Sequence, residues 1–365
     1  MPSANCHYDL AIIGGGPAGS AGAITAARAG ARVALFESRH YPRHKVCGEF
    51  VSAEALDVLS DLLAQPAAIH SLLDPAPILN RTRLWVGKRR LEAPVSPAGR
   101  SIPRYELDAA LWRAAQSAGV ICHNDCEVSS IQGDGPFELR TAAQAVNARA
   151  LIVAAGRWSQ FIADRTLPPG PKWIGLKAHF REAHPSLTTD LYFFDHGYCG
   201  VQPVSSEAVN ACAMVRSDRV SSLEEVFRLH PALHERALNW VALTAPVSTA
   251  PLVYRSPRPV RGNIVFVGDA AAFIDPFVGD GISIALRSGP AAAQCLRGFL
   301  AAEASLEDSV AAYEREYSRQ FAPLLAAAAR VRGLLSLQGL AQVAAFELLR
   351  LPGVLPYIIR KTRRA

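Results

Sequence analysis

The chain has 365 residues, of which 50% are apolar, 19% charged and 8% aromatic. A chain of this size buries a sizeable core in about two or three domains, and no polar repetitive tract indicates disorder or a fibre. The formal net charge of +6 comes from Lys and Arg spread along the chain. Nucleic acid is therefore not a predicted partner, whereas an anionic cofactor, an anionic substrate or a membrane surface would fit this charge.

Cysteine usage and the first residues indicate a cytoplasmic protein with reduced thiols. The seven cysteines are scattered, and no pair has the spacing of a zinc ribbon. No basic stretch followed by an apolar one opens the chain, so a secretory signal is not predicted. His40, His44 and Cys47 lack a fourth ligand, and we interpret them as part of a solvated loop rather than a metal site.

A glycine-rich loop follows the first expected strand. Residues 8–13 are an apolar run typical of a buried parallel strand, a helix is expected over 20–29, and a second strand over 31–36 ends on Glu37. Between strand and helix, Gly14 permits a tight turn, Gly16 lets backbone amides approach a pyrophosphate, and Gly19 lets the helix pack closely. Glu37 lies 23 residues after Gly14, where a carboxylate accepts hydrogen bonds from both ribose hydroxyls. The unit predicts a bound dinucleotide, the alternative being an ordinary loop.

A second glycine-rich region lies near residue 270, where a simple NAD dehydrogenase needs none. An apolar strand over 261–268 runs into Asp269, a loop follows through Asp275, and a helix begins near Gly281. The ribityl chain and ring of FAD extend past the pyrophosphate and require such a second site. We expect Asp269 to bind a ribityl hydroxyl and the helix N-terminus to face the pyrimidine side of the ring. The alternative is the same three elements without a ligand.

Two further stretches are expected beside the cofactor. A third strand over 148–154 is followed by Ala155 and Gly156. Arg104 stands just before a helix with one apolar face and can reach the cofactor, the alternative being a surface arginine.

Three stretches together resemble a group of flavoproteins that contains aromatic hydroxylases, flavin halogenases and geranylgeranyl reductases. They are the unit from Gly14 to Glu37, the segment Lys45-Val46-Cys47-Gly48-Glu49, and residues 268–289. The first is common to many flavoproteins, whereas the last is specific, and the nearest resemblance is to the geranylgeranyl reductase-like branch. The resemblance implies an α/β fold in which an FAD-binding Rossmann-like domain is interleaved with an α+β antiparallel-sheet substrate domain, with helices at the C-terminus.

The resemblance also implies domain limits and site residues. The FAD-binding domain is expected over 1–75, 100–165 and 250–300, the substrate domain over 76–99 and 166–249, and a C-terminal helical cap over 301–365. The patterns of residues 81–95 and 173–215 fit the sheet that roofs the flavin. Residues 192–203 are similar to a turn on the substrate side, so Tyr192, Tyr198 and Pro203 are pocket candidates, with core packing as the alternative for the tyrosines. The expected cofactor residues are Gly14, Gly16, Pro17, Ala18, Gly19, Glu37, Arg104, Val128, Ala155, Gly156, Gly268, Asp269, Pro276, Gly279, Asp280, Gly281 and Ile282.

Departures from the resemblance bear on the electron donor and on halogenation. Hydroxylases of this group carry an Asp-Gly pair that helps to recognise NADPH, and this chain has Ala155-Gly156 in that place. Direct use of NADPH is therefore not favoured, and the donor is left between NAD(P)H and a reduced carrier protein. The Trp-x-Trp-x-Ile-Pro motif of flavin halogenases is missing, which argues against halogenation.

If the protein is a reductase, reduced flavin passes a hydride from N5 to a C=C bond of a lipophilic, prenyl-like or polyketide-like substrate. Cys47 lies in a loop that the resemblance places near the substrate side, and it is the candidate catalytic residue. A small buried hydrophobe is its alternative role. Two other functions stay open, an FAD-dependent monooxygenase of an aromatic or polyketide-type substrate and a flavin-binding protein without catalysis. The oligomeric state is not indicated.

Residues 331–359 are apolar with few charges, and the basic run 360–364 follows them. Pro352 and Pro356 interrupt this segment, so a membrane-spanning helix is not predicted. We expect a helical cap over the substrate pocket. The alternative is an interfacial segment attracted to anionic lipid, which would give the protein a peripheral membrane contact.

Overall fold

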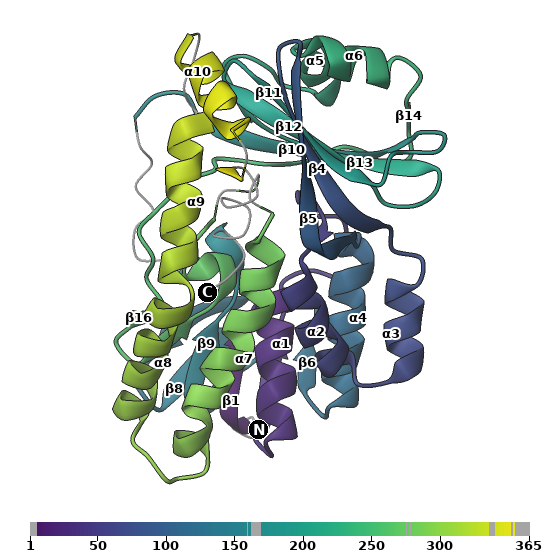
Figure 1. Cartoon of the computed structure of the whole chain (residues 1–365). Coiled ribbons are helices and arrows are strands. Elements are labelled where there is room, and N and C mark those ends of the chain that lie inside the picture. The colour runs from purple at the N-terminus through teal and green to yellow at the C-terminus, as the bar shows by residue number, and fades with distance from the viewer. Residues whose placement is uncertain are drawn as a thin grey trace.

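The computed structural model describes residues 6–158, 160–161, 169–274, 276, 279–335, 340–351 and 353–354. Two β-sheets lie one above the other, and helices cover the lower sheet and the outer face of the upper one (Figure 1). The chain passes between the two sheets several times, so each sheet is built from segments far apart in the sequence.

The first sheet is mainly parallel, in the order β16-β17-β9-β1-β2-β6. Its strands are β1 (Cys6–Ile13), β2 (Val33–Phe36), β6 (Ile121–His123), β9 (Ala145–Val153), β16 (Val260–Arg261) and β17 (Ile264–Phe266). β1 pairs in parallel with β2 on one side and β9 on the other. β2 is buried along its whole length, as expected for a strand covered on both faces. An unexpected hairpin, β7 (Val128–Gln132) and β8 (Phe137–Thr141), extends the sheet from β9.

Helices flank the first sheet. They are α1 (Pro17–Arg28), α2 (Ala53–Leu63), α3 (Pro66–Leu73), α4 (Arg104–Ser117), α7 (Gly281–Leu300) and α8 (Leu306–Gln320). α3 lies outermost, against α2 and α4 (Figure 1). α1 begins at Pro17, three residues before the expected start, because proline suits the first turn of a helix. α1 and α7 approach closely, since a Cβ on Gly289 would lie 2.0 Å from the carbonyl oxygen of Ala18.

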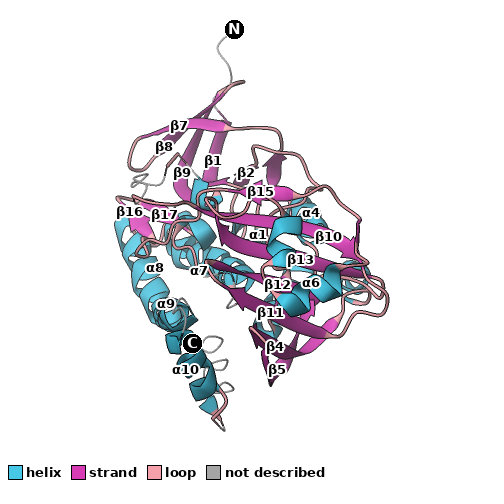
Figure 2. Ribbon diagram, turned by 90° about the horizontal axis from the view of Figure 1, so that it is seen from above, coloured by secondary structure: helices cyan, strands magenta, loops and turns pink. Residues whose placement is uncertain are grey.

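The second sheet has the order β14-β10-β13-β12-β11-β4-β5-β3, with β15 also paired to β10. Its strands are β3 (Phe50–Val51), β4 (Ile78–Val86), β5 (Arg89–Ser101), β10 (Trp173–Arg181), β11 (Thr188–Phe194), β12 (Gly197–Pro203), β13 (Ala208–Arg216), β14 (Val241–Ala242) and β15 (Val247–Thr249). All its pairs are antiparallel except β11 with β4. The short helices α5 (Leu223–Arg228) and α6 (Pro231–Ala237) cover its outer face (Figure 2).

The C-terminal helices connect the two layers. α9 (Ala322–Leu335) rises beside the lower sheet, and α10 (Leu340–Leu349) reaches the upper one (Figure 1). There Phe346 and Leu349 pack with Leu84, Phe193 and Met214. Pro352, Pro356 and the basic run 360–364 lie outside the described residues. Within the described part, no helix is both long enough and apolar enough to cross a membrane.

The expected α/β fold with two sheets and C-terminal helices is observed. One segment departs from the expected division, because β3 joins the second sheet although it lies within the range 1–75 assigned to the cofactor domain. The domain limits themselves stay a prediction.

Candidate functional site

A cavity of about 1010 Å³ lies between the two sheets. Its floor contains the residues that follow the carboxyl ends of β1, β2, β9 and β17, among them Gly14, Glu37, Ala155 and Gly268. Its ceiling is the inner face of the second sheet. Ligands of open parallel sheets bind at the carboxyl ends of the strands, so this floor is where a dinucleotide is expected.

The three glycines of the first loop differ in what they do for the fold. Gly14 has φ +105°, and a Cβ there would lie 2.4 Å from the carbonyl oxygen of Ala154. A Cβ on Gly19 would lie 1.8 Å from the carbonyl oxygen of Gly14, so Gly19 serves helix packing. At Gly16 the nearest atom to an added Cβ is the Lys45 Nζ, 3.8 Å away. The fold therefore tolerates a side chain at Gly16, and its bare backbone faces the cavity instead.

Two helix N-termini face this cavity without a side chain to cap them. Gly16, Pro17 and Ala18 begin α1, while Gly281 and Ile282 begin α7, and all five line the cavity. Neither helix has an acidic residue in its first turn. Uncapped N–H groups and the positive end of the helix dipole attract anions, which fits phosphate at one end and a reduced flavin ring at the other.

The Glu37 carboxylate is fixed at the end of β2. Its Oε2 accepts hydrogen bonds from the Gly15 backbone N–H at 3.0 Å and the Tyr41 hydroxyl at 3.1 Å. Its Oε1 accepts from Arg43 Nη2 at 3.0 Å and the Arg39 backbone N–H at 3.1 Å. The carboxylate is thereby oriented at the cavity wall, where it was predicted to meet ribose. Tyr41 and Arg43 were not identified from the sequence.

A buried group of charges lies beside the glycine loop. Asp108 is fully buried, and its carboxylate contacts Lys45 Nζ at 2.8 Å and Arg104 Nε at 2.7 Å. Lys45, Arg104 and Arg43 line the cavity. Together with Glu37 these groups are three cations against two carboxylates, which leaves one positive charge. This excess suits an anionic pyrophosphate. Lys45 was noted only as part of the family-like segment.

Asp108 gives the protein a specific sensitivity to acid. Burial alone would raise its pKa, but the charges of Arg104 and Lys45 lower it from 3.8 to about 2. A lowered pKa stabilises the folded state above pH 4, and this stabilisation, about 2 kcal/mol, is lost as the pH falls from 4 to 2. We expect the free energy of unfolding, measured by denaturant titration, to fall more steeply in this range for the wild type than for Asp108→Asn. Parallel curves for the two proteins would contradict this.

Glu49 links the loop over residues 43–49 to the second sheet. It has φ +65° and is fully buried. Its Oε1 accepts hydrogen bonds from Lys177 Nζ at 2.8 Å and the Arg104 backbone N–H at 2.9 Å, while its Oε2 lies 2.7 Å from His179 Nε2. Burial alone would raise the pKa of Glu49, but the hydrogen bonds from His179 and Lys177 lower it. The carboxylate is thus charged and holds the loop against β10. The sequence pattern did not single out this cluster.

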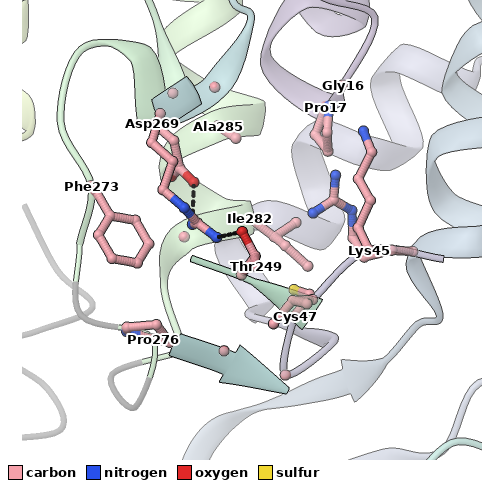
Figure 3. A pocket seen from close by; sticks show the side chains of 18 of the residues that line it. Gly16, Pro17, Lys45, Cys47, Thr249, Asp269, Phe273, Pro276, Ile282 and Ala285 are labelled. Carbon is pink, nitrogen blue, oxygen red and sulfur yellow. Dashed lines mark hydrogen bonds and ion pairs between the residues drawn. The ribbon is translucent and has the colours of Figure 1, made fainter. Parts of the chain in front are cut away.

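Cys47 lies near the centre of that loop and lines the cavity (Figure 3). Its carbonyl oxygen accepts a hydrogen bond from Asn210 Nδ2 at 2.9 Å, and its Sγ accepts one from the Glu49 backbone N–H at 3.3 Å. Burial raises the pKa of the thiol. Cys47 is therefore a protonated thiol at neutral pH, held in place and open to a ligand.

Asp269 lies on the opposite side of the cavity from Lys45 (Figure 3). Its Oδ2 is 3.5 Å from Arg157 Nη1, and Arg157 Nη2 donates to the Thr249 hydroxyl at 3.2 Å. Burial raises the pKa of Asp269, and the charge of Arg157 opposes that shift. The preceding Gly268 has φ +57°, which suits the sharp turn after β17.

The structure brings most of the predicted site residues to this cavity. Those that line it are Gly14, Gly16, Pro17, Ala18, Glu37, Cys47, Arg104, Val128, Ala155, Gly156, Tyr198, Gly268, Asp269, Pro276, Gly279, Gly281 and Ile282. Asp275 lies outside the described residues. Gly19 and Asp280 are buried and do not line the cavity.

The pocket assignment of Tyr192 is wrong. Its side chain lies in the core beneath α5 and α6, where its ring stacks 5.6 Å from Trp85 and its hydroxyl accepts a hydrogen bond from Arg236 at 3.2 Å. Side chains alternate along a strand, and the cavity-facing residues of β11 are Thr189 and Leu191. Pro203 is likewise misassigned, because β12 presents Tyr198, Gly200 and Gln202 to the cavity.

A sequence model described as FAD dependent oxidoreductase matches residues 40–270, more than half of the chain. The chain belongs to this family. A second model with the same description matches residues 9–48, which contain the glycine loop. FAD is thus the cofactor of this oxidoreductase, and the bare backbone at Gly16, the uncapped helices and the excess positive charge fit it.

Individual relatives are distant. A menaquinone reductase of Mycobacterium tuberculosis is 26% identical over 322 residues, with 79% of this chain and 76% of the relative covered. Digeranylgeranylglycerophospholipid reductase 2 of Methanopyrus kandleri is 24% identical over 357 residues, with 86% and 84% covered. Conditioned medium factor receptor 1 of Dictyostelium discoideum is 24% identical, and the chain spans 63% of its length.

Among solved structures, a flavin-dependent brominase has a TM-score of 0.82 at 20% identity, with 98% of this chain and 93% of the brominase covered. At this identity the likeness concerns the fold. It confirms the α/β architecture with its Rossmann-like domain, second sheet and C-terminal helices.

Proposed function

We propose that the protein reduces a C=C bond of a lipophilic, prenyl-like or polyketide-like substrate, as a member of the geranylgeranyl reductase-like branch. The observation that carries the proposal is the protonated Cys47 thiol, which is held in the cavity beneath a largely apolar ceiling. Two relatives named as reductases, of menaquinone and of digeranylgeranylglycerophospholipid, support it. With a lipophilic substrate, we also propose a peripheral membrane contact through which the substrate is reached.

The residues of the floor would hold FAD. Gly16 and the N-terminus of α1 would bind its phosphates, Glu37 its ribose, and Asp269 its ribityl chain. Arg104 and Lys45 would balance the phosphate charge. When bound and reduced, FAD supplies a hydride.

Saturation of a C=C bond requires a proton as well as a hydride, and Cys47 is placed to provide it. Its raised pKa keeps the proton on sulfur until a carbon atom of the substrate becomes basic. The Glu49 backbone N–H, which already contacts Sγ, would stabilise the thiolate that is left. The apolar part of the ceiling excludes water, which limits side reactions of the reduced cofactor.

The decisive experiment is turnover without oxygen. The holoprotein is reduced with dithionite under strict anaerobiosis and mixed with digeranylgeranylglycerophospholipid or menaquinone, and the return of oxidised flavin absorbance is followed. We expect reoxidation and a product in which one C=C bond of the side chain carries the two added hydrogens; with menaquinone, formation of the quinol alone would not count as this product. Cys47→Ala should retain FAD and react about 100-fold more slowly, the range for loss of a general acid.

The other outcomes identify the alternatives. Substrate conversion that requires oxygen would indicate an FAD-dependent monooxygenase. Flavin that stays reduced with every substrate under anaerobiosis, together with no substrate conversion after oxygen is admitted, would indicate a flavin-binding protein without catalysis. Dithionite is used because the physiological donor is open between NAD(P)H and a reduced carrier protein.

A further inference from the structure

The ceiling of the cavity changes from polar to apolar across successive rows of the second sheet. In one row, cross-strand partners place polar side chains next to each other on the inner face, namely His179, Asn210, Gln202, Thr189 and Thr82. Two residues away on each strand, the next row contains Lys177, Cys212, Gly200, Leu191 and Leu84. Lys177 is paired with Glu49 and does not line the cavity, so the lining part of this row is uncharged. The row after that contains Met214 and Tyr198.

The apolar end of the cavity is closed by parts of the chain outside the sheet. Leu252, Phe273 and Leu349 line the cavity and pack with Met214 and Tyr198. The Arg157 guanidinium lies over the Phe273 ring, 4.5 Å from its centroid, and is paired with Asp269. This end therefore suits a hydrocarbon chain.

Three residues of the polar row, Thr82, Thr189 and Gln202, line the cavity. Gln202 is 3% exposed. Its Nε2 donates to the Ser101 hydroxyl at 2.7 Å, and its Oε1 accepts from the Thr189 hydroxyl at 3.3 Å. Both hydroxyls can donate or accept, so in either orientation of the amide its nitrogen donates to one of them. An amide nitrogen carries two hydrogens, and among the described residues the Gln202 nitrogen has one acceptor.

The hydroxyl of Thr82 is not a competing donor, because it donates to the Thr189 carbonyl oxygen at 3.1 Å. His179, at the end of the row, is engaged with Glu49. The cavity-facing part of the row thus offers amide and hydroxyl groups rather than a charge. A buried donor without an acceptor is unfavourable, so a ligand that supplies an uncharged oxygen gains affinity here.

We infer that Gln202 determines substrate specificity by donating a hydrogen bond to an uncharged oxygen on the polar head of an amphipathic lipid, whose hydrocarbon chain extends towards Leu349. This inference rests on the proposed function for the nature of the ligand. It adds the orientation of the substrate and the chemistry of its head group, a hydroxyl, carbonyl or ether oxygen.

Binding of two probes to the oxidised holoprotein tests the inference without turnover. The probes are geranylgeraniol and the hydrocarbon with the same carbon skeleton but no hydroxyl, both presented in the same detergent micelles. Binding is followed by the change in flavin absorbance. We expect the wild type to bind geranylgeraniol about tenfold or more tightly, and Gln202→Leu to lose this preference while it binds the hydrocarbon unchanged.

Met214→Ala is the matched control at the apolar end. This variant should weaken the binding of both probes by the same factor, because it removes contacts with the hydrocarbon chain of the probe and none with its head group. Gln202→Met keeps the side-chain length and is the control for an effect of altered packing. The FAD content of each variant is measured as well. Retained preference in both Gln202 variants, a wild type without preference, or failure of both probes to bind the wild type would each overturn the inference.

Failure of the inference about Gln202 can be distinguished from failure of the proposed reaction. If the probes behave as expected but no substrate reoxidises the flavin anaerobically, the head-group site stands and the reaction is wrong. If anaerobic reduction occurs without a role for Gln202, the reaction stands and the orientation is wrong.

Discussion

Gly16→Val is expected to remove FAD from the protein while leaving the fold intact. A side chain at this position would meet only the Lys45 Nζ, 3.8 Å from an added Cβ, so it would project into the cavity. The backbone at Gly16 is extended, with φ −70° and ψ −176°, which any residue adopts. The valine would occupy the place where the pyrophosphate must approach the backbone. We expect about a 100-fold loss of affinity for FAD, or roughly 2.7 kcal/mol.

The measurements are the ratio of flavin to protein absorbance after purification and titration of the apoprotein with FAD. Ala29→Val is the control, since it makes a similar change at the exposed far end of the same helix. Gly14→Val should instead prevent folding, because its Cβ would meet the backbone of Ala154. Full flavin occupancy in Gly16→Val would show that the pyrophosphate does not lie at this loop.

The glycine loop shows how much of the site the sequence could predict. Strand, turn and helix follow one another within residues 6–28, so local patterns determine the loop. The same holds for Gly281, where a turn opens a helix. The carboxyl ends of parallel strands meet at one edge, and therefore Glu37 and Asp269 could be assigned to one site before their positions were known.

Tyr192 shows where sequence patterns fail. Residues 191–194 are all buried, because α5 and α6 cover one face of β11 and the cavity ceiling forms the other. A strand buried on both faces has no alternation of polar and apolar residues, so the sequence could not indicate which face Tyr192 occupies. Only the register of the second sheet shows that Thr189 and Leu191 face the cavity.

The cluster around Glu49 was missed for a different reason. Glu49 and Lys177 are 128 residues apart, and they meet only because the loop over residues 43–49 lies against β10. A lysine in a strand ordinarily indicates a solvent-facing position. Here it is buried, and no local pattern could have indicated its partner.

Glu49→Gln is expected to destabilise the protein by about 3–5 kcal/mol, the usual effect of leaving a buried charge without its partner. The Lys177 side chain is 1% exposed, so its ammonium group could not be hydrated in the variant. The Glu49 carboxylate also contacts His179 and the Arg104 backbone, and these contacts would weaken as well. The measurement is the free energy of unfolding in denaturant. Glu92→Gln is the control, because Glu92 is 28% exposed and pairs with two solvent-accessible arginines, Arg81 and Arg83, so it should change stability by about 1 kcal/mol or less.

A double-mutant cycle distinguishes a buried ion pair from general damage to the core. Lys177→Met alone should also be strongly destabilising, since it leaves the Glu49 carboxylate buried with His179 as its remaining side-chain partner. The double variant, Glu49→Gln with Lys177→Met, removes both charges and should lose much less stability than the sum of the two single changes. Additive losses would mean that the two side chains act independently. Because this pair holds the loop that carries Cys47, we further expect the double variant to bind FAD but to react more slowly than the wild type with any substrate that reoxidises its flavin.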